Sequence, residues 1–143
     1  MKKATAYQRE EKIFLHSLSK TNAGVWILSE PVLAQASIDT PTLGRSVLAV
    51  LNGSMEQVAH PTNWKGLFDP MLKQAGVKTL NSFMKKCKCV EIESDAGLVS
   101  FLPMKNQGSS GGFESLDMKV GPIALSEASD VGEKLNSAFD LAM

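Results

Sequence analysis

The spacing of hydrophobic residues in the middle of the chain, over residues 43–83, is typical of a series of short amphipathic helices. The first helix has four apolar positions that share one side, and these are Leu43, Val47, Leu48 and Leu51. Asp39 or Thr40 can cap its start, and Pro41 fits its first turn, where a missing N–H is tolerated. Asn52 and Gly53 are suited to end it.

Two further helices are predicted in the same stretch. The second has apolar residues at helical spacing before Gly76, and these are Trp64, Leu67, Phe68, Met71 and Leu72. Pro70 either kinks this helix or marks a break after Asp69. Thr79 can cap a third, short helix that carries Leu80 and Phe83.

Two apolar segments before the helical stretch predict a β-hairpin. Residues 12–18 and residues 25–34 are apolar, and residues 21–24 between them have the composition of a turn. Pro31 lacks the N–H that a β-ladder uses, so it favours an edge position or a bulge in the second strand.

A second hairpin is predicted after the helices. Residues 88–94 alternate in polarity, which places Val90 and Ile92 on one face and Cys89, Glu91 and Glu93 on the other. Residues 95–97 form the turn, and residues 98–102 return as a strand that ends at proline 103.

The C-terminal part is expected to contain a loop, a short strand and a helix. Residues 106–112 are rich in glycine and serine and predict a loop, and residues 116–120 predict a short strand. Ser126 or Ser129 can cap the final helix. Its buried stripe is predicted to be Val131, Leu135, Ala138, Phe139 and Ala142.

This order of elements predicts an α+β fold. Strands come in consecutive runs joined by tight turns, so we expect a mostly antiparallel sheet with several short helices packed on one face. The length of 143 residues fits a single domain, over residues 1–143, with a sufficient core.

The charge balance argues against a protein that binds nucleic acid directly. Fifteen basic and fifteen acidic residues cancel, whereas a nucleic-acid-binding protein normally has a basic excess. The chain has neither a secretory leader pattern nor an apolar run long enough to span a bilayer. We therefore expect a cytoplasmic protein without a membrane partner.

The residues that carry reactive chemistry do not form a recognisable catalytic or metal-binding set. Cys87 and Cys89 are expected to be free thiols, because a disulfide between them would be strained, and they lack the second ligand pair of a zinc site. His16 lies in a predicted strand and His60 in a turn before Pro61, where local hydrogen bonds are expected. The sequence predicts no enzyme, no cofactor and no metal.

Acidic and aromatic residues are the remaining candidates for a functional surface. Glu91, Glu93 and Asp95 form an acidic row, which is either the solvated face of a sheet or a contact for a basic partner. Lysines adjoin this row at positions 85, 86 and 88. Trp26 and Trp64 have apolar neighbours and are predicted to lie in or near the core.

The middle of the chain resembles the immunity proteins of bacterial contact-dependent growth inhibition. These bind and silence the toxic C-terminal domain of a matching surface effector. The resemblance is carried by Gly44, Arg45, Ser46, Val47, His60, Pro61, Thr62, Trp64, Ala75, Gly76, Val77, Lys78 and Phe83. Matching positions outside this block are Gly24, Val25, Trp26, Pro103, Gly111, Gly112 and Phe113.

The resemblance implies an immunity protein that binds its cognate toxin domain, a nuclease, by fit and charge and without catalysis. The expected toxin-binding residues are Glu91, Glu93, Asp95, Asn106, Glu114 and Asp117. Two alternatives stay open: a small hydrolase or nucleic-acid-processing enzyme that uses His16 or His60, and an adaptor for another cytosolic protein. The sequence leaves the toxin, its activity and the oligomeric state undetermined.

Overall fold

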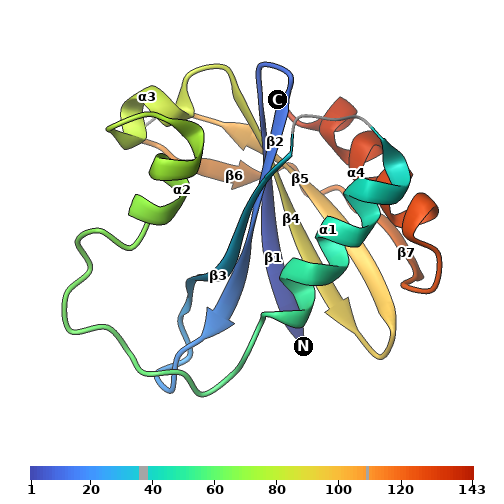
Figure 1. The fold of residues 1–143 in the computed structure, drawn as a ribbon, viewed down its shortest axis with the longest axis horizontal. Coiled ribbons are helices and arrows are strands. Elements are labelled where there is room, and N and C mark those ends of the chain that lie inside the picture. The colour runs from blue at the N-terminus through green and yellow to red at the C-terminus, as the bar shows by residue number, and fades with distance from the viewer. Residues whose placement is uncertain (36–38, 109) are drawn as a thin grey trace.

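The computed structural model describes residues 1–35, 39–108 and 110–143. Its strands are β1 (Lys2–Arg9), β2 (Lys12–Lys20), β3 (Trp26–Gln35), β4 (Cys87–Asp95), β5 (Leu98–Asn106), β6 (Phe113–Ser115) and β7 (Val120–Ala124). Its helices are α1 (Thr40–Asn52), α2 (Asp69–Ala75), α3 (Leu80–Met84) and α4 (Ala128–Leu141). The chain thus forms one α+β domain, as predicted (Figure 1).

The strands pair antiparallel in the order β3-β2-β1-β4-β5-β6, and β7 pairs with β5 beside β6. The sheet is open, and both predicted hairpins, β2–β3 and β4–β5, are part of it. Pro31 meets both conditions expected of it. It lies in the edge strand β3, and the β2–β3 register shifts between His16 and Ser17, so that Glu30 and Pro31 have no partner on β2.

Strand β1 lies at the centre of the sheet between β2 and β4, although the sequence did not predict it as a strand. Its apolar residues on one face are only alanines, Ala4 and Ala6, and both are completely buried. Alanine is a poor strand former, and only Thr5 and Tyr7 of the opposite face favour a strand by their own propensity. The two neighbouring strands supply the pairing that keeps it extended.

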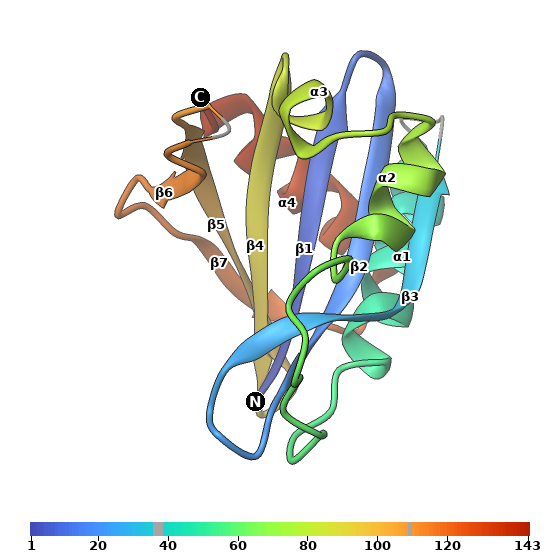
Figure 2. The same cartoon turned by 90° about the vertical axis from the view of Figure 1, so that its left-hand side faces the viewer.

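One face of the sheet is covered by α1 and α4, and we call it the helical face (Figures 1 and 2). Its core joins the predicted stripes of both helices to apolar residues of the central strands, including Val90, Ile92 and Phe101. The two helices approach so closely that a Cβ on Gly44 of α1 would lie 1.7 Å from the Ala128 carbonyl oxygen.

The opposite face carries α2, α3 and β6 at one end only, and we call it the pocket face (Figure 2). A second apolar cluster forms there around Tyr7, Phe14, Met71 and Phe83. The expected arrangement of helices on one face therefore describes α1 and α4, whereas α2 and α3 pack on the other face. Since α2 and α3 are short, part of the pocket face stays uncovered.

Several element boundaries differ from the sequence predictions. The second helix starts only at Asp69, because Gly66 adopts a positive φ of 78° and turns the chain, and Pro70 occupies its first turn. Strand β5 continues through Pro103 rather than ending there. Its pairing with β7 stops before Pro103 and its pairing with β6 starts after it, and the Pro103 carbonyl points to that side of the strand. No neighbouring strand requires its missing N–H there.

The C-terminal predictions are partly correct. The strand expected over residues 116–120 is wrong, since β6 ends before it and β7 begins at its last residue. The loop expected over residues 106–112 is confirmed for residues 107–108 and 110–112, whereas Asn106 still belongs to β5. Residue 109 lies outside the described part. Helix α4 has Glu127 rather than Ser126 or Ser129 at its N-cap, but its predicted apolar stripe is buried. No helix in the described ranges is long and apolar enough to cross a membrane.

Candidate functional site

The uncovered part of the pocket face contains a cavity of about 450 Å³ that opens to solvent. Strands β1 to β6 and the loop before α2 all contribute to its lining. Its aromatic lining residues are Tyr7, Trp26, Trp64, Phe68 and Phe113. Its charged lining residue is Glu91. A larger hollow of about 590 Å³ between β3 and α2 has no aromatic lining residue.

The base of the cavity holds a hydrogen-bonded pair of residues, Tyr7 and His16. The His16 Nδ1 lies 2.9 Å from the Ser17 carbonyl oxygen, which can only accept, so Nδ1 carries the ring proton. The Tyr7 hydroxyl then donates to Nε2 across 3.2 Å. Burial lowers the pKa of His16 to about 4 and raises that of Tyr7, so both side chains are neutral at pH 7.

His60 is exposed, and its hydrogen bond goes to Thr21, 39 residues away in the sequence, rather than to a local partner as expected; its ring contact, with Trp64, is local. Its Nδ1 lies 3.0 Å from the Thr21 Oγ1, and its ring packs edge-to-face on Trp64 with centroids 5.2 Å apart. Among the ion pairs of the described residues, none includes a histidine. Neither histidine is therefore arranged with a carboxylate as a general base would be.

The two tryptophans occupy different environments. Trp26 is half-buried, and the Lys3 Nζ lies 5.3 Å from its ring centroid. Trp64 is 51% exposed, so the prediction that it belongs to the core is wrong. Because α2 starts after it, Trp64 lies in a loop at the cavity rather than on the buried side of a helix.

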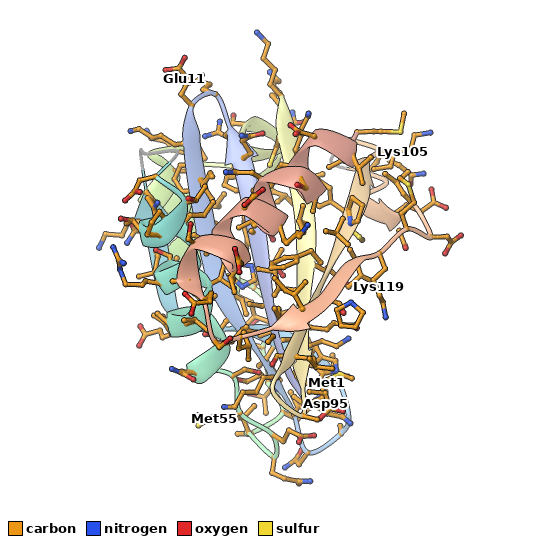
Figure 3. The ribbon with its side chains drawn as sticks, turned by 90° about the vertical axis from the view of Figure 1, so that its right-hand side faces the viewer. Met1, Glu11, Met55, Asp95, Lys105 and Lys119 are labelled. Carbon is orange, nitrogen blue, oxygen red and sulfur yellow. The ribbon has the colours of Figure 1, made fainter. Side chains whose placement is uncertain are left out.

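The predicted acidic row lies on the pocket face of β4, as the alternation of polarity indicated. Glu93 forms an ion pair with Lys3, its cross-strand neighbour on β1, at 3.3 Å. Glu91 lies opposite Thr5, which has no charge, and it faces the cavity. Asp95 is exposed at the end of the strand beside Met1 (Figure 3). Only Glu91 of this row lines the aromatic cavity.

The other three predicted contact residues lie elsewhere. Asn106 is at the end of β5 that carries the Lys105 labelled in Figure 3. Leu98, the cross-strand partner of Asp95, is at the other end, eight residues or roughly 26 Å away along the strand. The Asn106 Nδ2 donates to the carbonyls of Met84 (2.7 Å) and Cys87 (2.8 Å), which fixes the end of β5. Glu114 accepts a hydrogen bond from Gln107, and Asp117 is exposed between β6 and β7.

The lysines beside the acidic row do not neutralise it. Lys88 points to the helical face, where its Nζ donates to the Phe139 carbonyl at 3.2 Å. Lys85 and Lys86 are exposed in the turn between α3 and β4, at the opposite end of the strand from Asp95. None of these three lysines lines the cavity, and the charged residue of its lining is Glu91.

Both cysteines are free and buried on the pocket face. Burial raises the pKa of Cys87 to about 12 and also raises that of Cys89, so neither is a reactive thiolate at neutral pH. They pack as small apolar side chains beside Tyr7. Within the described ranges, no group of three or more His, Cys, Asp or Glu residues is placed to hold a metal ion.

Comparison with known proteins gives a fold but no family. No protein-family model matches the sequence, and no curated protein matches it. A chain of the CdiA-CT/CdiI toxin and immunity complex from Yersinia pseudotuberculosis superposes with a TM-score of 0.81 at 12% identity, over 99% of this chain and 97% of that one. A protein of unknown function from Neisseria meningitidis superposes with a TM-score of 0.80 at 17% identity, over 99% and 95%. At these identities the likeness establishes a shared fold over the whole chain.

Proposed function

We propose that this protein is an immunity protein that binds and neutralises the toxic C-terminal domain of a contact-dependent growth inhibition effector. The observation that carries the proposal is the superposition, over nearly the entire length of both chains, on a chain from a toxin and immunity complex. The sequence resemblance in residues 43–83 supports it independently. The protein acts in the cytoplasm, where the toxin would otherwise reach its target.

The two faces of the sheet have different roles in this proposal: one stabilises the fold and the other binds the toxin. The helical face is closed by α1 and α4 and forms the larger core, which makes the scaffold rigid. The pocket face leaves an aromatic cavity open to solvent, with Trp64 exposed beside it. Tryptophan is enriched among residues that dominate binding energy at interfaces, and a rigid scaffold reduces the entropy lost on binding. The pocket face is therefore the surface that binds the toxin.

The proposed toxin is a nuclease, because the charges available for contact are acidic. A nuclease carries basic residues that hold phosphates, and acidic side chains of an inhibitor complement them. Glu91, Glu93 and Asp95 are the proposed contacts on β4, with Glu114 and Asp117 extending the surface near β6. Asn106 contributes by holding the end of β5, since both its donor hydrogens are bonded inside the protein.

Inhibition in this account needs no catalysis by the immunity protein. The alternative enzyme depends on His16 or His60, and the observed contacts of both are structural. A buried, neutral histidine whose two nitrogens are bonded to Tyr7 and Ser17 has no nitrogen left for a substrate. Blocking the toxin's active site or its path to substrate is sufficient.

Coexpression tests the proposal. The toxin domain of the effector encoded beside this gene is expressed from an inducible promoter, with and without this chain. We expect the chain to restore growth at equal expression, and a toxin domain from an unrelated effector to remain lethal. Growth arrest that persists in the presence of soluble, folded chain contradicts the proposal. The His16→Gln and His60→Gln variants should still protect, whereas the enzyme alternative requires them to fail.

A further inference from the structure

We infer that the cavity on the pocket face binds one basic side chain, lysine or arginine, that a protein partner inserts, with Glu91 as its counter-ion. This inference rests on the proposed function for the identity of the partner, which is the toxin domain. It adds a specific recognition site to that function.

The first argument is the charge of Glu91. This side chain is half-buried, and it makes no ion pair or side-chain hydrogen bond with any residue that the structure describes. A carboxylate that is partly removed from water without a partner is costly, and a cation in the cavity offsets that cost. An anionic ligand would be repelled, and a purely apolar one would leave Glu91 unpaired.

The second argument is that the chain itself contains this interaction, two residues away from Glu91 and Thr5 along β4 and β1. The Lys3 Nζ lies 3.3 Å from the Glu93 Oε1 and 5.3 Å from the centroid of the Trp26 ring. A lysine of this chain is thus held between a β4 glutamate and an aromatic face. At the next position Thr5 replaces the lysine, so Glu91 has the carboxylate and the aromatic neighbours without the cation.

The third argument is the shape and composition of the cavity. A volume of about 450 Å³ falls within the range of ligand pockets, about 300–1,000 Å³. Aromatic walls suit a long basic side chain, because its apolar stem packs on the rings while its charge interacts with ring faces. The rings of Trp26, Trp64, Phe68 and Phe113 provide these walls.

The fourth argument is the exposure of Trp64, which indicates a macromolecule rather than a free small cation. Trp64 lines the cavity, and it is still 51% exposed. Its ring is held by the edge-to-face contact with His60, which is bonded to Thr21 at the end of β2. An exposed, positioned tryptophan at a cavity is typical of a protein–protein contact.

The test uses the full chain and small probes, with NMR detection of the tryptophan indole N–H signals. The chain has two tryptophans, Trp26 and Trp64, and both line the cavity, so their signals report its occupancy. The probes are the Nα-acetylated amides of arginine and lysine, the same derivative of citrulline as a neutral analogue of arginine, and tetramethylammonium. The matched variants are Glu91→Gln and Glu93→Gln, which remove the free and the Lys3-paired carboxylate respectively.

The inference predicts that the arginine or lysine probe shifts both indole signals saturably, and that citrulline binds at least about tenfold more weakly. Glu91→Gln should weaken the basic probe by a similar factor, and Glu93→Gln should change it by less than about twofold. The inference is overturned by the absence of a saturable shift, by equal binding of citrulline, by an unaffected Glu91→Gln variant, or by tetramethylammonium binding more tightly than both basic probes. No toxin takes part in this titration, so its failure is distinct from a failure of growth rescue.

Discussion

Thr5 on β1 is the cross-strand neighbour of Glu91 on β4. The next pair on the same face, Lys3 and Glu93, forms an ion pair, whereas Thr5 has no charge to offer Glu91. One uncharged residue therefore leaves a carboxylate free beside an aromatic cavity. This relationship defines the site that we assign to the partner.

Replacing Thr5 by lysine should fill the site from within. Thr5 lines the cavity, so a lysine there can extend toward Glu91 as Lys3 does toward Glu93. We expect Thr5→Lys to weaken binding of the arginine probe at least about tenfold. NMR titration measures the binding, and urea denaturation checks that the variant still folds, because Thr5 is buried in the original chain. Thr5→Val is the control and should keep binding within about threefold, since it adds no charge; equal binding by both variants would contradict the role of Glu91.

Trp64 should contribute to binding and little to stability. Its side chain is 51% exposed, so Trp64→Ala removes few core contacts and should lower the free energy of unfolding by less than about 1 kcal/mol. We expect the same change to weaken the toxin complex by at least about 2 kcal/mol, or roughly thirtyfold in Kd. Leu141→Ala is a control, because Leu141 is 45% exposed and lies on α4, on the helical face. If both variants bind equally well, the pocket face is not the interface.

The contact between α1 and α4 should depend on its glycines. A Cβ at Gly44 would lie 1.7 Å from the Ala128 carbonyl oxygen, and one at Gly132 would lie 2.0 Å from the Thr40 carbonyl oxygen. Both obstacles are backbone atoms, so the helices must separate. We expect Gly44→Ala or Gly132→Ala to cost about 2–3 kcal/mol in urea denaturation despite the better helix propensity of alanine. Ala49→Ser on the exposed side of α1 should cost less than about 0.5 kcal/mol. A neutral effect at both glycines would mean that the helices pack less closely.

Acidification should destabilise the protein through His16. Its pKa is 6.5 in an unfolded chain and about 4 when buried in the fold, so between these pH values the unfolded state binds the proton and the folded state does not. Stability is therefore fully present above pH 6.5 and falls as the pH approaches 4, by up to about 3 kcal/mol from this residue. Urea denaturation at pH 7, 5.5 and 4.5 measures the loss.

The matched variant for this pH dependence is His16→Gln, which can still hydrogen-bond to Tyr7 but does not titrate. Carboxylates contribute equally to both proteins, so the difference in slope isolates His16. We expect a shallower decline in the variant over this pH range. Identical slopes would show that His16 is not held neutral by the fold.

The sequence predicted the elements whose pattern is local. Helix α1, the Thr79 cap of α3 and the apolar stripe of α4 follow from spacing and capping within a few residues, and the structure confirms them. Strand β1 was missed because its residues on the helical face are the small Ala4 and Ala6 and its ends are charged or polar, and its pairing with two neighbouring strands fixes its conformation. Its central place cannot be inferred from periodicity.

The same distinction applies to the candidate site. Alternation along β4 placed Glu91, Glu93 and Cys89 on one face correctly. The spacing of Trp64 with Leu67 and Phe68 resembled a helix, but Gly66 between them adopts a positive φ, and a glycine there was the available signal for a loop. The cavity itself is assembled from strands β1 to β6, and the grouping of residues so far apart in the chain depends on the sheet order.

Calorimetric titration of the full chain into the toxin domain encoded beside its gene tests the central claim most directly. We expect a one-to-one complex with nanomolar affinity, which Glu91→Gln weakens at least about tenfold and Glu93→Gln weakens less, because the Glu93 carboxylate is already paired with Lys3. The absence of binding between the two folded, pure proteins would contradict the claim that this protein acts by occupying a toxin.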